Sequence, residues 1–315
     1  MKKISAVICT YNRYDVLHKA IASLEAQTLP KQDYEILVID NSPDFEAAQK
    51  VKEHYEENEN LSYIIEKTPG LSNARNVAAN AAEGEFVAFM DDDAIASSGW
   101  LEKILEAAEQ FESADVIGGR IDPLWEEERP SWLGDELLGN VSVVNWGGRC
   151  RIANEEEWFA GANITFRKET LLKHGGFQTN LGRKGSGAVL LSNEESALIE
   201  KIKSDNGVIV YQPEARVDHL VEKKRLQQPW FRKRASWQAV SDFLMKPEEQ
   251  VRYLGSDWEN LIGYINSMEP QNRNIRALTY PTDDPQVFKW QLSAIYTITR
   301  LSLSGFEGLE DSRHA

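Results

Sequence analysis

The chain has little cysteine, no long apolar run and a shortage of positive charge. Its two cysteines, Cys9 and Cys150, cannot form a disulfide framework or a zinc-binding spacing. The first apolar run, Ile4–Cys9, is too short for the core of a signal peptide and predicts a strand, and no run approaches the roughly 18 residues that span a bilayer. With 50 Asp and Glu against 35 Lys and Arg, the net charge is −15. Nucleic acid, which basic patches bind, is therefore not an expected partner, and we expect a cytoplasmic protein without a transmembrane segment.

Strand-like and helix-like patterns alternate along the N-terminal part of the chain. Hydrophobic residues make up 42% of the sequence and charged residues 27%, which is ordinary for a globular protein. Apolar runs and apolar residues at helical spacing predict strands at 4–9, 34–39, 61–65 and 85–90 and helices at 16–24, 45–55 and 71–82. This alternation without hairpin signals predicts a parallel sheet that is covered by helices on both faces and joined by right-handed crossovers.

Polar residues gather where the expected strands end. Thr10, Tyr11 and Arg13 follow the first strand, Asp40 follows the second, and the triplet Asp91–Asp93 follows the fourth. Ligands of parallel α/β sheets bind beyond the carboxyl ends of the strands. The sequence therefore predicts a ligand site at this edge of the sheet.

The triplet Asp91–Asp93 predicts a cation site. In an extended chain, alternate side chains share a face, so we expect Asp91 and Asp93 to lie together and Asp92 to turn away. Like charges this close repel each other unless a cation neutralises them, and oxygen ligands suit Mg²⁺ or Mn²⁺. A solvated acidic loop is the alternative for the triplet taken alone.

The remainder of the chain is expected to become helical toward its C-terminus. The patterns predict helices at 99–111 and 193–204, strands at 116–121, 157–166 and 208–211, and a loop at 123–145. Beyond His219, apolar residues at helical spacing predict helices at 228–243, 248–268 and 287–303. A helical C-terminal extension follows from these patterns.

Six sequence blocks, taken in order, resemble the glycosyltransferases of family 2. They are VICTYNR (7–13), VIDNS (38–42), GLSNARN (70–76), FMDDD (89–93), NEESAL (193–198) and YQPEARVDH (211–219), and the resemblance covers residues 4 to about 245. One block alone would be weak evidence, but the ordered set is specific. The resemblance implies a GT-A fold, which is an α/β fold with a Rossmann-like, mostly parallel sheet flanked by helices. It implies a domain at 1–245, with a nucleotide-binding half at 1–95 and an acceptor and catalytic half at 96–245, followed by a helical extension at 246–315.

The resemblance also implies a donor site. In the family, aspartates at the positions of Asp91 and Asp93 hold a divalent metal against the phosphates of a nucleotide-diphospho-sugar, and in many members a histidine at the position of His219 is a third ligand. Mn²⁺ or Mg²⁺ is therefore the expected cofactor and a UDP-sugar the expected donor. Capping of the following helix is the alternative role for Asp40, and a surface ion pair is the alternative for Arg75. The residues expected to contact the nucleotide are Thr10, Tyr11, Arg13, Asp40, Arg75 and Asp92.

Glu194 and Glu195 stand where the family has a Glu-Asp pair whose aspartate is the general base. A sugar hydroxyl that displaces a nucleotide loses its proton as it attacks, so a carboxylate must lie within hydrogen-bond reach. Glu195 is the expected base, but the departure from Glu-Asp leaves open which acid acts. For Glu194 the alternative is an acid favoured in the first turn by the helix macrodipole. Trp158 and Asn163 fall in the segment that faces the acceptor in relatives.

These features favour a metal-dependent inverting glycosyltransferase that acts on a saccharide or a glycoconjugate, including a lipid-linked acceptor. Peripheral contact with a membrane and the oligomeric state stay open. A sugar-1-phosphate nucleotidyltransferase is one alternative, but it normally needs a Gly-rich loop soon after the first strand, and residues 10–14 contain no glycine. A non-catalytic nucleotide-sugar binder is another, against which the intact acids argue. The sugar, the acceptor and the linkage do not follow from the sequence.

Overall fold

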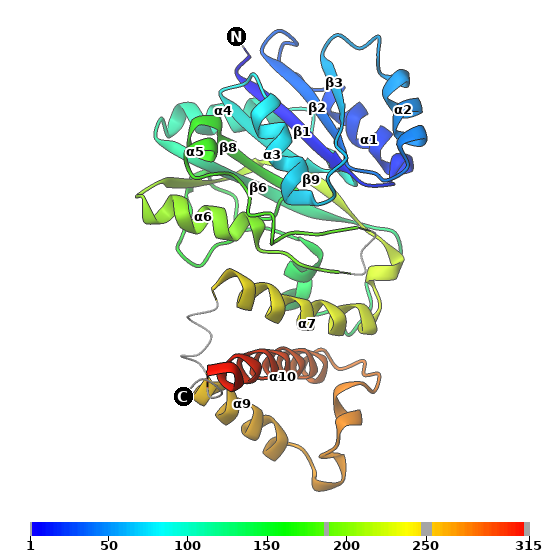
Figure 1. The fold of residues 1–315 in the computed structure, drawn as a ribbon, viewed down its shortest axis with the longest axis vertical. Coiled ribbons are helices and arrows are strands. Elements are labelled where there is room, and N and C mark those ends of the chain that lie inside the picture. Colours follow the sequence, from blue (N-terminus) through cyan, green and yellow to red (C-terminus); the bar gives the residue numbers. More distant parts are fainter. Residues whose placement is uncertain (1, 186–188, 247–253, 312–315) are drawn as a thin grey trace. The chain divides into compact units, whose positions relative to one another are not determined.

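The computed structural model describes residues 2–185, 189–246 and 254–311, and Figure 1 shows its ribbon. The chain forms two units by the packing of its residues. The first comprises 1–124, 142–188 and 194–220, and the second comprises 125–141, 189–193 and 221–315. The expected domain boundary at residue 245 stays a prediction. By packing, residues 221–245 are grouped with the C-terminal helices.

The first unit begins with the predicted alternation of strands and helices. Its first strands are β1 (Ile4–Thr10), β2 (Tyr34–Asp40), β3 (Leu61–Ile65) and β4 (Phe86–Asp91), and its first helices are α1 (Tyr14–Glu25), α2 (Phe45–His54) and α3 (Leu71–Ala81). β1 pairs in parallel with both β2 and β4, and β2 pairs in parallel with β3. β1 and β4 are buried along nearly their whole length, which explains their continuous apolar sequences, because a parallel sheet is covered on both faces.

The rest of the sheet contains antiparallel strand pairs, and the alternation of strands and helices in the N-terminal part makes no prediction for these strands. The strands are β5 (Ala94–Ala96), β6 (Ala114–Trp125), β7 (Arg151–Ile152), β8 (Asn163–Arg167) and β9 (Val208–Val221). The order is β3-β2-β1-β4-β8-β6-β9-β5, with β7 paired to β9. β8 runs antiparallel to β4 and β6, and β5 and β7 run antiparallel to β9. No α-helix lies between β6 and β8 in the described chain, so no crossover connection forces β8 to run parallel to β6.

Three strands differ from their expected extents, and the one expected at 116–121 runs from Ala114 to Trp125. The strand expected at 157–166 begins only at Asn163, because residues 157–162 form a loop and a turn. The strand expected at 208–211 continues to Val221. Pro213 reads as a strand breaker in sequence, but the alternating burial beyond it is that of an antiparallel strand with one face toward solvent.

Aromatic side chains fill the core of the first unit. The rings of Phe89, Phe166 and Phe177 meet edge to face, with centroids 5.3 to 6.2 Å apart, which is a favourable geometry for aromatic pairs. Trp100, at the start of α4, is fully buried. The unit is completed by α4 (Trp100–Gln110), α5 (Lys168–Lys173) and α6 (Glu194–Ser204). An α/β sheet flanked by helices is therefore confirmed.

The second unit is helical, as expected for the C-terminal part. It contains α7 (Gln228–Met245), α9 (Leu254–Ser267), α10 (Pro285–Asp311) and the short 3₁₀ turns η1 (Asp135–Val141), η2 (Lys223–Arg225), η4 (Pro270–Asn272) and η5 (Ile275–Leu278). The rings of Trp132, Phe231 and Phe288 pack together in its core. Of the helix expected at 248–268, residues 248–253 lie outside the described residues. None of the helices in the described ranges is long and apolar enough to cross a membrane.

Candidate active site

The carboxyl ends of three parallel strands meet at one edge of the sheet. In the register of the sheet, Thr10 on β1 lies beside Asp40 on β2, and Cys9 lies beside Asp91 on β4. Tyr11, directly after β1, is half-buried. Parallel pairing thus brings together residues from three separate parts of the chain, as the strand-end pattern predicts.

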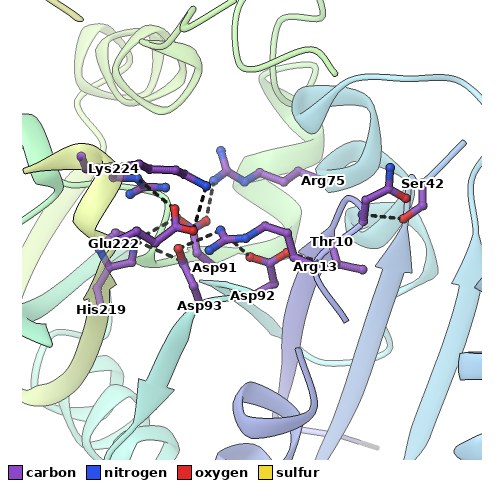
Figure 2. A network of polar contacts seen from close by, with 12 residues as sticks. Thr10, Arg13, Ser42, Arg75, Asp91, Asp92, Asp93, His219, Glu222 and Lys224 are labelled. Atoms are coloured by element: carbon purple, nitrogen blue, oxygen red, sulfur yellow. Dashed lines mark hydrogen bonds and ion pairs between the residues drawn. The ribbon is translucent and has the colours of Figure 1, made fainter. Parts of the chain in front are cut away.

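Asp91, Asp93 and His219 converge at the end of β4 (Figure 2). His219 comes from β9, where it pairs with Ala94 of β5. Each of the three side chains offers a ligand atom, and these atoms lie within 4.8 Å of one another. Nε2 of His219 is 3.2 Å from Oδ1 of Asp93 and 3.8 Å from Oδ2 of Asp91. The three predicted metal ligands, called the metal-binding cluster below, are brought together by the fold.

The atoms of the metal-binding cluster fit a small divalent cation. Ligand bonds of about 2.1 Å at roughly right angles place neighbouring ligand atoms about 3 Å apart, so the observed separations need only small adjustments. Nδ1 of His219 is buried and has no hydrogen-bond partner, as donor or acceptor, among the described residues. If Nε2 ligates the cation, Nδ1 carries the ring proton. Two carboxylates and one imidazole could hold a divalent cation whose remaining ligands come from a bound substrate and water.

Asp92 contacts Thr10 and Arg13. The hydroxyl of Thr10 donates to Oδ2 of Asp92 at 2.7 Å, and Nη1 of Arg13 donates to Oδ1 at 3.2 Å. The same Nη1 atom lies 2.8 Å from Oδ2 of Asp93. The chain turns at Asp92 and Asp93, so the extended geometry assumed for the triplet is wrong, and a turn orients these side chains. Burial and the charge of Asp93 raise the pKa of Asp92 to about 7, against the opposing effect of Arg13.

Asp40 is fully buried and accepts three hydrogen bonds. The hydroxyls of Tyr14 and Tyr63 donate to Oδ2 at 3.0 and 2.6 Å, and the backbone N–H of Ser42 donates to Oδ1 at 2.9 Å. Asp40 does not cap α2, because Asp44 is the N-cap and accepts from a backbone N–H of that helix. A carboxylate has about four acceptor positions, so Oδ1 retains capacity for one more donor.

Arg75, on α3, lies beside Asp91 of the metal-binding cluster (Figure 2) and also contacts the two glutamates. Its Nη1 donates to Oε1 of Glu194 at 2.9 Å and to Oε1 of Glu195 at 3.0 Å. Its Nη2 lies 3.6 Å from Oδ1 of Asp91. Arg75 is 2% exposed, so its ion pairs are buried and the alternative of a surface pair is wrong. Burial opposes its charge, but the carboxylates more than compensate and raise the pKa of Arg75 above its usual range.

Glu194 and Glu195 begin α6 and differ in exposure. The side chain of Glu194 is 4% exposed and that of Glu195 is 13% exposed. Oε2 of Glu194 is buried and has no hydrogen-bond partner among the described residues. Burial and the neighbouring charge of Glu195 raise the pKa of Glu194 to about 7, while Arg75 acts in the opposite direction. The greater exposure of Glu195 favours it over Glu194 as the group that meets an acceptor.

We expect Glu194 to make the stability of the protein depend on pH. Its pKa rises from an ordinary value of 4.5 to about 7 on folding, so the folded state binds more protons between these values. The stabilising contribution is fully present below the lower pKa and is lost as the pH rises through 7, with a slope of at most about 1.4 kcal/mol per pH unit. In Glu194→Gln this part of the slope should vanish, which urea unfolding at pH 5, 6, 7 and 8 measures.

Glu200→Gln is the matched control for that experiment, since Glu200 is exposed on the same helix. The difference in unfolding free energy between Glu194→Gln and wild type should grow in favour of the variant from pH 5 to pH 8. Charges near Glu194 come from Arg75, Glu195 and Arg183, and they are common to all three proteins. A difference that stays constant over this pH range would contradict the prediction.

The two predicted acceptor-binding residues are placed differently. Trp158 is half-buried, and its ring meets that of Trp146 edge to face at a centroid distance of 6.1 Å. Asn163 is 1% exposed. Its amide donates to backbone carbonyls on β6 and β9 at 2.9 and 2.7 Å and accepts from the indole of Trp100 at 2.9 Å. These hydrogen bonds link the Asn163 amide to β6, β9 and α4. Trp158, in contrast, is partly exposed to solvent.

Several contacts of the site were not found from the sequence. Tyr14 and Tyr63 hold Asp40, and the one available signal was a tyrosine within the aliphatic run of β3, because a buried hydroxyl usually needs a partner. The pairing of Arg75 with Glu195 joins residues 120 positions apart. No local pattern reports a pairing at that separation.

The fold and the site together define a class of protein. A sheet flanked by helices that carries three converging side chains suited to a metal ion and a pair of adjacent glutamates has the architecture of the GT-A glycosyltransferases. The family model described as glycosyl transferase family 2 matches residues 5–172, which is more than half of the chain. The chain therefore belongs to glycosyltransferase family 2.

Comparisons with individual proteins agree with this assignment. The glucosyl-dolichyl phosphate glucuronosyltransferase of Haloferax volcanii is 28% identical over 245 residues, or 77% of each chain. The mannosyltransferase PcManGT from Pyrobaculum calidifontis, solved with GDP-Man and Mn²⁺, has a TM-score of 0.61 at 17% identity over 97% of this chain and 87% of that one. S. aureus TarS 1-349, solved with UDP-GlcNAc, has a TM-score of 0.55 at 17% identity over 96% and 91% of the two chains. The solved structures share the fold, and the family makes this protein a glycosyltransferase.

Proposed function

We propose that this enzyme moves a sugar from a nucleotide-diphospho-sugar to a hydroxyl of a saccharide or lipid-linked acceptor, with a divalent cation and with inversion at the anomeric carbon. The arrangement around Arg75 carries the proposal. One guanidinium contacts both Asp91 of the metal-binding cluster and Glu195. The group that would hold the leaving diphosphate and the group that would take the acceptor's proton are therefore separated by little more than one guanidinium.

The metal-binding cluster supplies the cation site in this proposal. Asp91, Asp93 and His219 would hold the cation, which would act as a Lewis acid and neutralise the charge that grows on the leaving diphosphate. The nitrogen of His219 favours Mn²⁺ over Mg²⁺, because Mg²⁺ prefers oxygen ligands. A cation is also required by the overall charge, since a chain with a net charge of −15 repels an anionic donor.

The strand ends at β1 and β2 support a nucleotide position beside the metal-binding cluster. Asp40 can accept a hydrogen bond from the edge of a base through its remaining acceptor capacity, and Asp92 is proposed to bind the ribose. Uracil is the proposed base, and guanine is the alternative, because the structurally similar proteins were solved with GDP-Man in one case and UDP-GlcNAc in the other. Thr10, Tyr11 and Arg13 lie at the same edge and are proposed to line the base and the ribose, and Arg75 is proposed to face the donor.

Glu195 is the proposed general base. It would take the proton of the acceptor hydroxyl during attack on the anomeric carbon, and a single displacement of this kind inverts the configuration. The name of the Haloferax relative includes a dolichyl-phosphate-linked sugar, which supports lipid-linked acceptors as well as free saccharides for this chain. Membership of family 2 argues against both the nucleotidyltransferase and the non-catalytic binder.

A binding screen tests this function. Purified protein with Mn²⁺ is expected to show a higher melting temperature with at least one sugar nucleotide among UDP-glucose, UDP-glucuronate, UDP-GlcNAc and GDP-mannose, because a ligand that binds the native state stabilises it. Chelation with EDTA should abolish the shift, and the same sugar nucleotide should be slowly hydrolysed only with metal. UDP-glucose and GDP-glucose, compared as a matched pair, separate the two bases. Protein that binds none of these compounds, or binds them equally with EDTA, would overturn the proposal.

A further inference from the structure

We infer that Arg75 and Gly161 act together to position Glu195. The guanidinium of Arg75 holds the general base in a fixed orientation, and it fits there because Gly161 has no side chain. This inference rests on the proposed function, in which Glu195 is the base. It assigns Arg75 a task at the acceptor side of the reaction in addition to any contact with the donor.

The guanidinium of Arg75 is held from several sides. Besides its contacts with Glu194, Glu195 and Asp91, it lies over the ring of Phe177, with the central carbon 5.4 Å from the ring centroid. Planar guanidinium groups bind carboxylates with defined geometry and stack on aromatic rings. Arg75 therefore has little freedom to turn, and a carboxylate bonded to it is fixed with it.

Arg75 fixes one particular oxygen of Glu195. The bond at 3.0 Å is to Oε1, so Oε2 is the oxygen through which Glu195 can accept a proton. The second acid, Glu194, bonds to the same Nη1 atom through its own Oε1 at 2.9 Å. Because both carboxylates bond to this nitrogen, their positions relative to each other are fixed. Glu194 is the more buried of the two.

Gly161 leaves the space that this arrangement occupies. A Cβ atom at position 161 would lie 1.9 Å from Nη2 of Arg75 and 2.2 Å from Oε1 of Glu195. Gly161 is not among the glycines with positive φ, so its backbone does not require glycine. The requirement for glycine comes from these two side-chain ends, and a methyl group there would push them aside.

The substitution Gly161→Ala therefore tests the positioning of Glu195 without changing any charge. Because the crowded atoms belong to side chains and not to the backbone, the chain should fold while the pair of Arg75 and Glu195 shifts. A misplacement of about 1 Å in a reacting group can cost about 100-fold in rate. A purely structural role of Arg75 would lower the melting temperature without a matching loss of kcat in the folded protein, and a donor-binding role alone would lower activity only in step with donor affinity.

The experiment compares Gly161→Ala with wild type and with Gly148→Ala. Gly148 lies in the same unit, and a Cβ there meets nothing within 4 Å. The probe is the sugar nucleotide hydrolysed by wild type in the screen, with Mn²⁺ and water as the acceptor. In Gly161→Ala, kcat should fall about 10- to 100-fold, which is more than any change in the donor Kd measured by calorimetry, and the melting temperature should show that the protein is folded at the assay temperature. In Gly148→Ala all three quantities should match wild type.

A second change supplies a rescue. Glu195→Asp shortens the base by one methylene and withdraws its carboxylate from the methyl group at 161, so the double variant should be faster than the product of the two single effects predicts. Should Gly161→Ala fail to fold, Arg75→Lys keeps the charge and removes the planar fork, and it should lower kcat by more than any loss of donor affinity accounts for. An unchanged kcat, or a kcat that falls only in step with donor affinity, overturns the inference. A wild-type protein that cleaves no sugar nucleotide overturns the proposed function itself, whereas active wild type with an equally active Gly161→Ala overturns the inference alone.

Discussion

Glu195→Gln should lower the rate of sugar transfer by about 10²- to 10⁴-fold, the usual contribution of a general base. The amide keeps the size of the side chain and can still accept from Arg75, but it cannot take a proton from an acceptor hydroxyl. Donor affinity should stay near wild type, because the partner of Glu195 is Arg75 and no member of the metal-binding cluster. Initial rates of nucleotide release, measured alongside donor calorimetry, separate the two quantities.

Two comparisons sharpen this result. Glu200→Gln, on the exposed side of the same helix, should retain the wild-type rate. Glu194→Gln should lose less activity than Glu195→Gln, since the side chain of Glu194 is 4% exposed against 13% for Glu195. Equal rates in Glu195→Gln and wild type would remove Glu195 from the chemistry. A larger loss in Glu194→Gln would assign the base to the other acid.

The strand ends could be read from the sequence because the chemistry there is local. The apolar runs of β1, β2 and β4 each stop at a polar residue, and parallel pairing then places those residues at one edge. The antiparallel half was not predictable in the same way. β8 enters the sheet beside β4, and its partner is set by packing across the sheet, which no pattern within 163–167 reports.

The site shows the same division between local and long-range information. The proposed metal ligands could be named from two aspartates next to one strand and a histidine in a recognisable block. The orientation of the base depends on Arg75 and Gly161, which are distant in sequence from Glu195. A glycine that is needed for space rather than for its backbone looks like any other glycine in sequence. For Asn163 the residue type was misleading. Asparagine suits hydrogen bonds to sugars, but here its amide joins two strands.

Asp93→Asn is expected to abolish metal-dependent donor binding. Asp93 is 1% exposed in its side chain, with Oδ1 3.2 Å from His219 and Oδ2 2.8 Å from Arg13. The amide keeps the shape and removes one of two carboxylate charges from the metal-binding cluster. Loss of an outer-shell partner typically lowers metal affinity by 10- to 100-fold, so loss of a direct ligand should exceed about 100-fold. Titration of Mn²⁺ followed by electron paramagnetic resonance measures this affinity without depending on turnover.

The matched control is Asp218→Asn, which removes a carboxylate next to His219 on β9 whose contact is Arg216 at 3.8 Å. Both variants lose one negative charge, so a general change in the field of this acidic chain would weaken Mn²⁺ binding equally in the two. Only Asp93→Asn should lose Mn²⁺ affinity and, with it, the affinity for the sugar nucleotide. Asp93 belongs to the group of three converging ligand atoms, and Asp218 does not. Wild-type Mn²⁺ affinity in Asp93→Asn would mean that the charge of the leaving diphosphate is balanced elsewhere, with Arg13 and Arg75, which contact the triplet, as the candidates.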